Sequence, residues 1–284
     1  MHKTTKGSLS RNRAVSSILS YGILILGACI VILPVFWMVI TAVKNDLEIY
    51  QMNGAILPLE VTATSFIRIW KDYDFILYFR NSLVVTFAAV MISLIASALT
   101  GYGATRFNFK GKGVFLSFIL MTQMFPSIML LVPFYKILSI YGLNNSLVGL
   151  CIVYISFTIP FCSWMMVGYF RTIPLDIDES AAIDGASHIQ TFLQIILPLV
   201  RPGIVSSAIY AFITCWNEYM FAAILIMDDK MKTAAVAIAE MNGYYRIAWN
   251  DMMAASLVAS VPLIIAFIFM QKSFISGLTA GAVK

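Results

Sequence analysis

The sequence predicts an all-α integral membrane protein with six transmembrane helices and a polar loop between the fourth and fifth. The composition indicates a membrane protein, because 60% of the 284 residues are hydrophobic and only 12% are charged. A soluble domain has about 25% charged residues, so this chain has too few to cover a surface that faces water. Six apolar segments are each close to the roughly 20 residues that a helix needs to cross a bilayer.

The spans are predicted at 17–43, 81–105, 114–138, 146–169, 202–227 and 253–274. The first is too long for the apolar core of a cleaved secretory signal, so we expect it to stay in the protein. Together the spans form one membrane domain over 17–276. A basic tail at 1–16 precedes that domain, and a short tail at 277–284 follows it.

The short loop after the second span sets the orientation. It carries Arg106, Lys110 and Lys112 and no acidic residue. Because short loops rich in Lys and Arg stay in the cytoplasm, both termini and the loop at 171–201 are predicted to be cytoplasmic. The net charge of +5 then reflects topology and does not call for nucleic acid as a partner.

The loop at 171–201, which we name the corner loop, carries dense local signals for two short helices. Pro174 suits a first helical position, and acidic residues follow it at the positive end of the helix. Asp184-Gly185 is typical of a helix stop, since Gly can take the left-handed conformation. Ser187 and Gln190 form a capping box for a second helix. One apolar face is then expected from Ile189, Phe192, Leu193 and Ile196.

Two interpretations of the corner loop stay open on these signals alone. It could be an ordinary, well-capped connection between spans. Alternatively it is a rigid docking element, because Ser180, Ala181 and Ala182 are small enough to let another surface approach closely.

A resemblance favours docking. The corner loop is similar to the EAA motif of permease subunits in ABC importers, which reads E-A-A, three residues, G, nine residues, I-x-L-P. The matching residues are Glu179, Ser180, Ala181, Gly185, Ile195, Leu197 and Pro198, with Ser180 where the family usually has Ala. The resemblance implies that these residues, with Asp184, couple the permease to an ATPase.

Other stretches resemble the second permease subunit of maltose-type importers. They are Asn81-Ser82, the segment from Ala104 to Gly111, and the end SFISGLTAGAVK. The resemblance implies a heterodimer with a second permease subunit, a dimer of ATPase subunits that holds ATP-Mg, an extracytoplasmic sugar-binding protein, and a bacterial or archaeal cytoplasmic (inner) membrane. This chain itself would bind no cofactor. In that family the tail reaches the ATPase dimer, which implies contacts for Thr279, Ala280 and Gly281; composition alone favours a frayed end.

Polar residues inside the spans are candidates for the translocation path. Asn217 and Glu218 fall within the fifth span, and Gln123 falls midway along the third. An acidic residue at membrane depth costs roughly 2.5–3.5 kcal/mol on insertion scales and usually faces a cavity or a partner. A hydrogen bond that fixes helix packing is the alternative for each of them.

These observations favour a non-catalytic transport subunit for a carbohydrate over other functions. An importer of glycerol phosphate or amino acids is the near alternative, although basic pore residues suited to a phosphate are not evident within the spans. An ion-coupled secondary transporter would need internal repeats and intramembrane charges for ion coupling, and only Glu218 qualifies as such a charge. A membrane-embedded enzyme would need clustered His, Asp or Glu, and neither such a cluster, a metal site nor a phosphate-binding loop is evident.

Overall fold

The computed structural model describes residues 6–50, 56–243 and 247–282, and within them helices account for nearly all regular structure. This confirms the all-α prediction. The helices are α1 (Lys6–Val43), α2 (Asp46–Tyr50), α3 (Thr64–Lys71), α4 (Phe75–Arg106), α5 (Lys112–Thr122), η1 (Ser127–Leu130), α6 (Leu131–Ile140), α7 (Leu147–Arg171), α8 (Asp176–Ile183), α9 (His188–Gln190), η2 (Thr191–Ile196), α10 (Leu197–Leu199), α11 (Arg201–Trp216), α12 (Met220–Leu225), η3 (Asp229–Met231), α13 (Ala234–Glu240) and α14 (Trp249–Ala282).

Four helical segments are long and apolar enough to cross a membrane: Leu19–Val43, Phe75–Arg106, Leu147–Arg171 and Trp249–Phe269. Two bent helix pairs pass the same test together. Lys112–Thr122 and Ser127–Ile140 meet at 97°, and His188–Leu199 and Arg201–Trp216 meet at 76°. The described chain therefore offers four spans, or up to six if each bent pair is one span, and the count of six stays a prediction.

The fifth predicted span is not one continuous helix. Helix α11 ends at Trp216 and α12 begins at Met220, so the predicted span at 202–227 is broken near its middle. No Pro or Gly lies in the break, so the usual sequence marks of a helix interruption are missing there.

The described residues divide into two compact units. The first contains the chain up to Tyr73 together with Met241–Val258, and the second contains Asp74–Glu240 with the chain from Ala259 onward. Helix α14 contributes to both units. We describe each unit separately.

In the first unit, Arg68 joins three helices. From α3 it donates two hydrogen bonds of 2.9 Å each to the carboxylate of Asp46 on α2, and its Nε lies 2.9 Å from Oδ1 of Asp251 on α14. Tyr73 Oη donates to the other Asp251 oxygen at 3.3 Å. The hydrogen bonds with Asp46 outweigh the desolvation of the guanidinium, so the pKa of Arg68 is raised.

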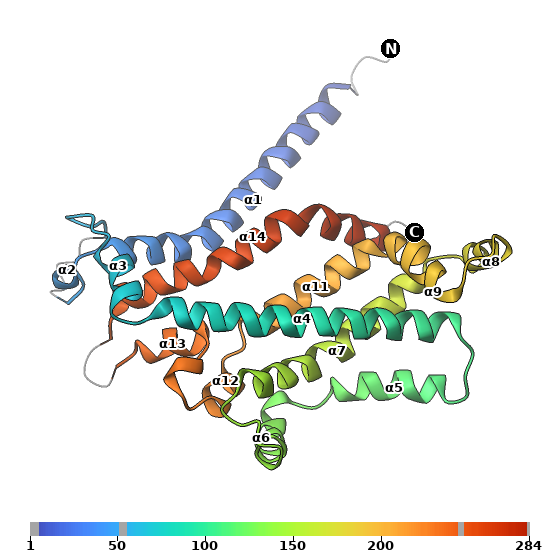
Figure 1. Ribbon diagram of the computed structural model, residues 1–284. Helices are drawn as coiled ribbons and strands as arrows, with labels where there is room; N and C mark the ends of the chain where they lie inside the picture. The colour runs from blue at the N-terminus through green and yellow to red at the C-terminus, as the bar shows by residue number, and fades with distance from the viewer. Residues whose placement is uncertain (1–5, 51–55, 244–246, 283–284) are drawn as a thin grey trace. The chain divides into compact units, whose positions relative to one another are not determined.

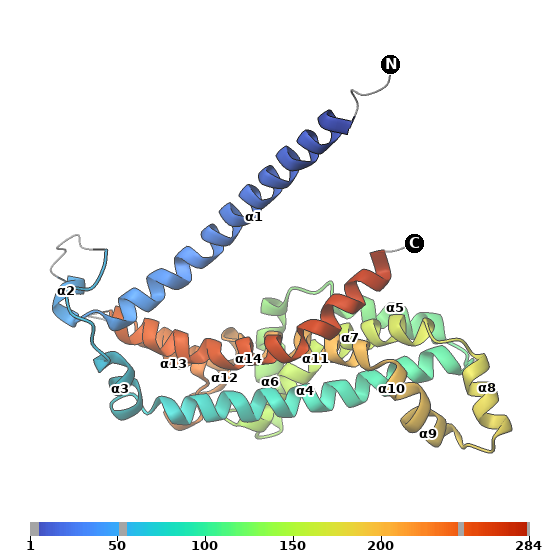
Figure 2. The same ribbon diagram turned by 90° about the horizontal axis from the view of Figure 1, so that it is seen from above.

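In the second unit, the long helices α4 and α7 lie side by side, and α11 packs on both (Figures 1 and 2). Small polar side chains line the α4–α7 contact: Ser93 Oγ lies 2.6 Å from Thr158 Oγ1, and Ser163 Oγ donates to Ser97 Oγ at 3.3 Å. Small residues let helix backbones approach closely in a membrane. Gly101 shows how close they are, because a Cβ built there would lie 2.7 Å from the ring of Phe170.

The N-terminal end of α4 holds the segment before α13. Asn81 Nδ2 donates to the carbonyls of Lys230 and Lys232 at 2.9 and 3.0 Å, and Ser82 Oγ accepts the N–H of Ala234 at 2.8 Å. Both side chains are buried. Asn81 and Ser82, which are among the stretches that carry the family resemblance, thus hold the connection between α12 and α14 in place.

Candidate functional site

The corner loop lies at the C-terminal end of α4, away from α12 and α13 (Figures 1 and 2). It contains α8, α9, the π-helical turn η2 and α10, and it leads directly into α11. The sequence predicted two short helices at a corner, and the structure places α8 and α9 on either side of Gly185.

The end of α8 matches the predicted stop. Gly185 has φ +83°, in the left-handed region. The N–H of Gly185 donates to the carbonyl of Ala182 at 3.1 Å, and that of Ala186 donates to Ala181 at 2.9 Å. This pair of bonds is a Schellman motif, which satisfies carbonyls that the helix leaves open. The predicted start was wrong by two residues, because α8 begins at Asp176 and not at Pro174.

The second helix begins as predicted but does not keep one apolar face. The Ser187 side chain accepts the N–H of Gln190 at 3.3 Å, and the Gln190 side chain accepts the N–H of Ser187 at 2.8 Å, which completes the capping box. The chain then winds into the π-turn η2, so the period of 3.6 residues is lost. Phe192 and Ile196 are buried, while Ile189 and Leu193 are 70% and 53% exposed.

The two halves of the EAA-like stretch have different surroundings. In the first half, Glu179, Ser180, Asp184 and Gly185 are exposed, and only Ala181 is buried by the chain itself. In the second half, Ile195 and Leu197 pack against a buried cluster of Tyr102, Met166, Phe170, Phe192 and Ile196, and Pro198 is exposed. The first half therefore presents a surface, and the second half fixes it to the helices behind.

Aromatic and charged contacts attach the corner loop to α4. The ring of Tyr102 lies 4.8 Å from that of Phe192, and the ring of Phe107 lies 5.8 Å from that of His188. Arg106, the last residue of α4, pairs with Asp178 of α8. In the sequence, Arg106 is a positive charge within the Ala104–Gly111 segment, and no local pattern connects it with Asp178.

The candidate path residues lie at helix breaks and not along continuous helices. Glu218 lies between α11 and α12, where Oε1 accepts the N–H of Phe221 at 2.8 Å and Oε2 accepts that of Ala222 at 3.1 Å. Its carboxylate therefore caps α12. Asn217, which is exposed, donates to the carbonyl of Ile213 at 3.0 Å. Gln123 ends α5 and donates to the carbonyl of Phe157 at 3.5 Å.

The C-terminal segment continues the last helix. Helix α14 continues to Ala282, so the backbone at Thr279, Ala280 and Gly281 is helical. A role for this segment in contacting an ATPase stays a prediction. The two final residues, and residues 1–5 of the predicted N-terminal tail, lie outside the described part; the tail is helical from Lys6.

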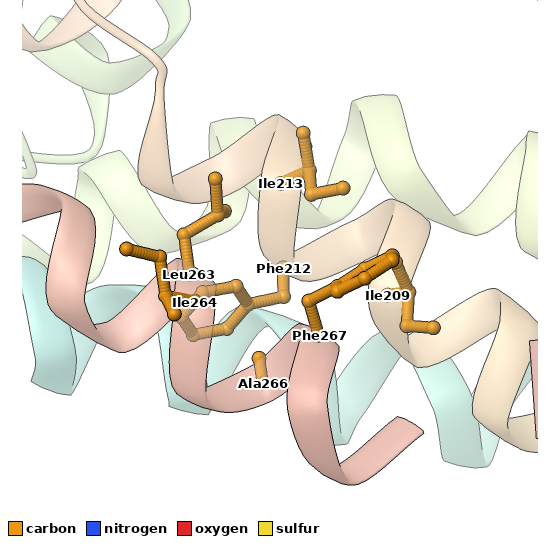
Figure 3. Close-up of a pocket in the computed structure, with 7 residues that line it drawn as sticks. All are labelled: Ile209, Phe212, Ile213, Leu263, Ile264, Ala266 and Phe267. Carbon is orange, nitrogen blue, oxygen red and sulfur yellow. The ribbon is translucent and has the colours of Figure 1, made fainter. Parts of the chain in front are cut away.

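A hollow of about 260 Å³ lies between α11 and α14 within the second unit (Figure 3). Its lining is Ile209, Phe212, Ile213, Leu263, Ile264, Ala266 and Phe267. No side chain in this set can donate or accept a hydrogen bond. A sugar would lose its hydration there without compensation, so the hollow suits an apolar group and not a carbohydrate.

The described residues contain no group of three or more His, Cys, Asp or Glu that could hold a metal ion. Cys151, Cys162 and Cys215 are buried as free thiols, and Cys29 is exposed.

Comparison with known proteins gives a consistent family. Residues 89–279 match the family described as "Binding-protein-dependent transport system inner membrane component". The trehalose/maltose transport system permease protein MalG of Thermococcus litoralis is 35% identical over 263 residues, covering 92% of this chain and 94% of that protein. The diacetylchitobiose uptake system permease protein DasC of Streptomyces coelicolor is 32% identical over 253 residues, covering 89% of this chain and 92% of that protein.

A solved structure supports the fold. The chain superimposes with a TM-score of 0.82 on a subunit of a bacterial ABC transporter involved in the import of the acidic polysaccharide alginate, at 20% identity, over 96% of this chain and all of that one. The family match spans the core helices, the corner loop and most of α14. On these grounds the chain is a multi-pass membrane protein and belongs to the family of inner membrane components of binding-protein-dependent transport systems.

Proposed function

We propose that this chain is the permease subunit of an ATP-driven importer for a carbohydrate, and that its corner loop receives the movement of separate ATPase subunits. Carbohydrate is favoured because the relatives' names specify trehalose, maltose and diacetylchitobiose. The family name specifies dependence on a binding protein, which we place outside the membrane. The chain has no phosphate-binding loop, so ATP-Mg belongs to a partner.

The observation that carries the coupling part of the proposal is the exposed apolar surface of the corner loop. Ile183 on α8 is 86% exposed and Ile189 on α9 is 70% exposed. Both lie beside a backbone that is fixed by the Schellman motif and the capping box. A rigid, water-facing element with exposed isoleucines fits the apolar cleft of a partner protein, where burial of each would contribute about 1.5–3 kcal/mol.

The proposed topology has six spans, with both termini and the corner loop in the cytoplasm. It takes the bent pair of α5 and α6 as one span. It takes α11 with α12 as another span, and leaves His188–Leu199 in the corner loop. Arg106, Lys110 and Lys112 support this orientation, because they cluster near the end of α4 where the corner loop lies. A second permease subunit would complete the translocation path, and Gln123, Asn217 and Glu218 are proposed to face it.

Reconstitution tests the proposal. The complex, purified from its own membrane through a tag on this chain, is placed in liposomes with the binding protein, and ATP hydrolysis is measured against a panel of sugars, amino acids and glycerol phosphate. Stimulation by one or more sugars is the expected result. Stimulation only by an amino acid or by glycerol phosphate would replace the substrate class, and uptake driven by an ion gradient without ATP would overturn the proposal.

The proposal that the corner loop docks an ATPase is tested by comparing the variants Ile183→Ser and Ile183→Leu. The Ser variant should retain less ATPase on purification, because it removes the apolar contact, while Leu keeps that contact. Equal retention in both variants would exclude Ile183 from the docking surface.

A further inference from the structure

Arg106 occupies a position where three segments of the second unit meet. It is the last residue of α4, and its side chain is only 6% exposed. Nη2 donates to the carbonyl of Ile173 at 3.1 Å, and Nη1 donates to that of Phe170 at 3.4 Å. These carbonyls belong to the end of α7 and the turn after it, where a cation both satisfies open acceptors and complements the helix dipole.

The third contact of Arg106 is with α8. Nε lies 2.9 Å from Oδ2 of Asp178, within ion-pair distance although the N–H does not point along a hydrogen bond. Oδ1 of the same carboxylate accepts from Tyr102 Oη at 3.5 Å, one turn earlier on α4. Asp178 is 19% exposed, so both charges are largely removed from water, and a pair of this kind is sensitive to loss of one partner.

We infer that Arg106 is a positioning residue for energy coupling: it makes the end of α4, the end of α7 and α8 move as one body when the corner loop is displaced. The inference rests on the proposed function, because it specifies how that function would be transmitted. Apolar packing also links the corner loop to α4, but apolar contacts have no preferred direction. The planar guanidinium adds directional contacts to two carbonyls and a carboxylate, so α8 cannot slide along α4 without breaking them.

We name the contacts of Arg106 with the carbonyls of Phe170 and Ile173 and with Asp178 the clamp. Substitutions on its two sides remove different numbers of these contacts. Asp178→Asn removes the α8 carboxylate that pairs with Arg106 but leaves the carbonyl contacts of Arg106 in place. Arg106→Gln removes all three contacts, because a shorter neutral amide cannot span them. Since both residues act through the same contact, the double variant should be no worse than Arg106→Gln alone. Arg80→Gln is the matched control, since Arg80 is an exposed arginine on the same helix, α4, and lies outside the corner loop.

The experiment compares sugar uptake per ATP hydrolysed in liposomes that contain the intact complex. Arg106→Gln should lower that ratio at least tenfold while basal ATP hydrolysis persists, Asp178→Asn should lower it less, and Arg80→Gln should leave it unchanged. A merely structural role would instead reduce the amount of assembled complex with the ratio preserved. An unchanged ratio in Arg106→Gln, or an equal loss in Arg80→Gln, would overturn the inference.

Amide hydrogen exchange separates this outcome from failure of the proposed function. If no solute stimulates ATP hydrolysis by the wild-type complex, the proposed function fails. The exchange rates of the backbone amides in α8 then still test whether Arg106 holds α8 in place. Faster exchange over Asp176–Ile183 in Arg106→Gln, with α7 unchanged before its last turn, supports the clamp. Exchange equal to wild type would refute it.

Discussion

Replacing Gly185 by leucine perturbs the corner loop at one backbone position and at little else. Gly185 has φ +83°, and nothing lies within 4 Å of a Cβ built there. The substitution therefore introduces no clash, and its cost is the left-handed backbone itself. That cost is about 1–2 kcal/mol for a residue with a side chain, which corresponds to a factor of about 5–30 in a two-state equilibrium.

The strain acts directly on the Schellman motif. If leucine shifts the backbone toward right-handed φ, the bond from the Ala186 N–H to the carbonyl of Ala181 is lost, and α8 leaves its place relative to α9. The amide of Ala186 should then exchange with solvent about 5–30 times faster. Uptake per ATP should fall in the same complex, while insertion and assembly remain as in wild type.

Two control variants isolate the backbone effect. Gly185→Asn should behave nearly as wild type, because Asn tolerates the left-handed conformation better than other residues. Gly168→Ala, at a helical glycine of α7 whose added Cβ also meets nothing within 4 Å, should be neutral or slightly stabilising. If Gly185→Leu shows wild-type exchange at Ala186 and wild-type coupling, the reasoning about the corner is refuted.

Three further changes have expected outcomes. Glu218→Gln leaves one acceptor for the two N–H groups that Glu218 now caps, so we expect a lower melting temperature of the purified complex; an unchanged melting temperature with lost transport would assign the charge to the translocation path. Gly203→Ala places a Cβ 2.5 Å from the Tyr169 ring, so expression and thermal stability should fall, and normal values would show that α7 and α11 can separate there. Ending the chain at Ser276 should spare insertion but reduce ATPase retention on co-purification, whereas equal retention would make the end of α14 dispensable.

Local physics explains which parts of the fold the sequence could predict. The Schellman motif and the capping box involve residues three to five positions apart, so Gly185, Ser187 and Gln190 determine them with little help from elsewhere. The long apolar helices follow from composition in the same way, because a bilayer requires only length and hydropathy.

The missed features either have a weak local sequence signal or depend on contacts between distant residues. The break at Glu218 has no Pro or Gly to mark it, and a glutamate that caps the next helix is a weak sequence signal compared with Ser, Thr, Asp or Asn. The burial of Phe192, and not of Leu193, involves its contact with Tyr102 on α4, which is distant in the sequence. The pairing of Arg106 with Asp178 likewise requires the ends of α4 and α7 to be side by side.

The division between local and distant contacts has a consequence for the transfer of the corner loop from one permease to a related one. The shape of the corner loop is encoded within its own residues, so a recombined gene could carry that shape into another permease intact. The contacts that hold the corner loop in place depend on residues outside it, Tyr102 and Arg106 at the end of α4. A corner loop that is transferred to another permease should therefore be transferred together with the end of α4. A chimera that carries only the corner loop would keep its local shape but lose the contacts that hold it against α4.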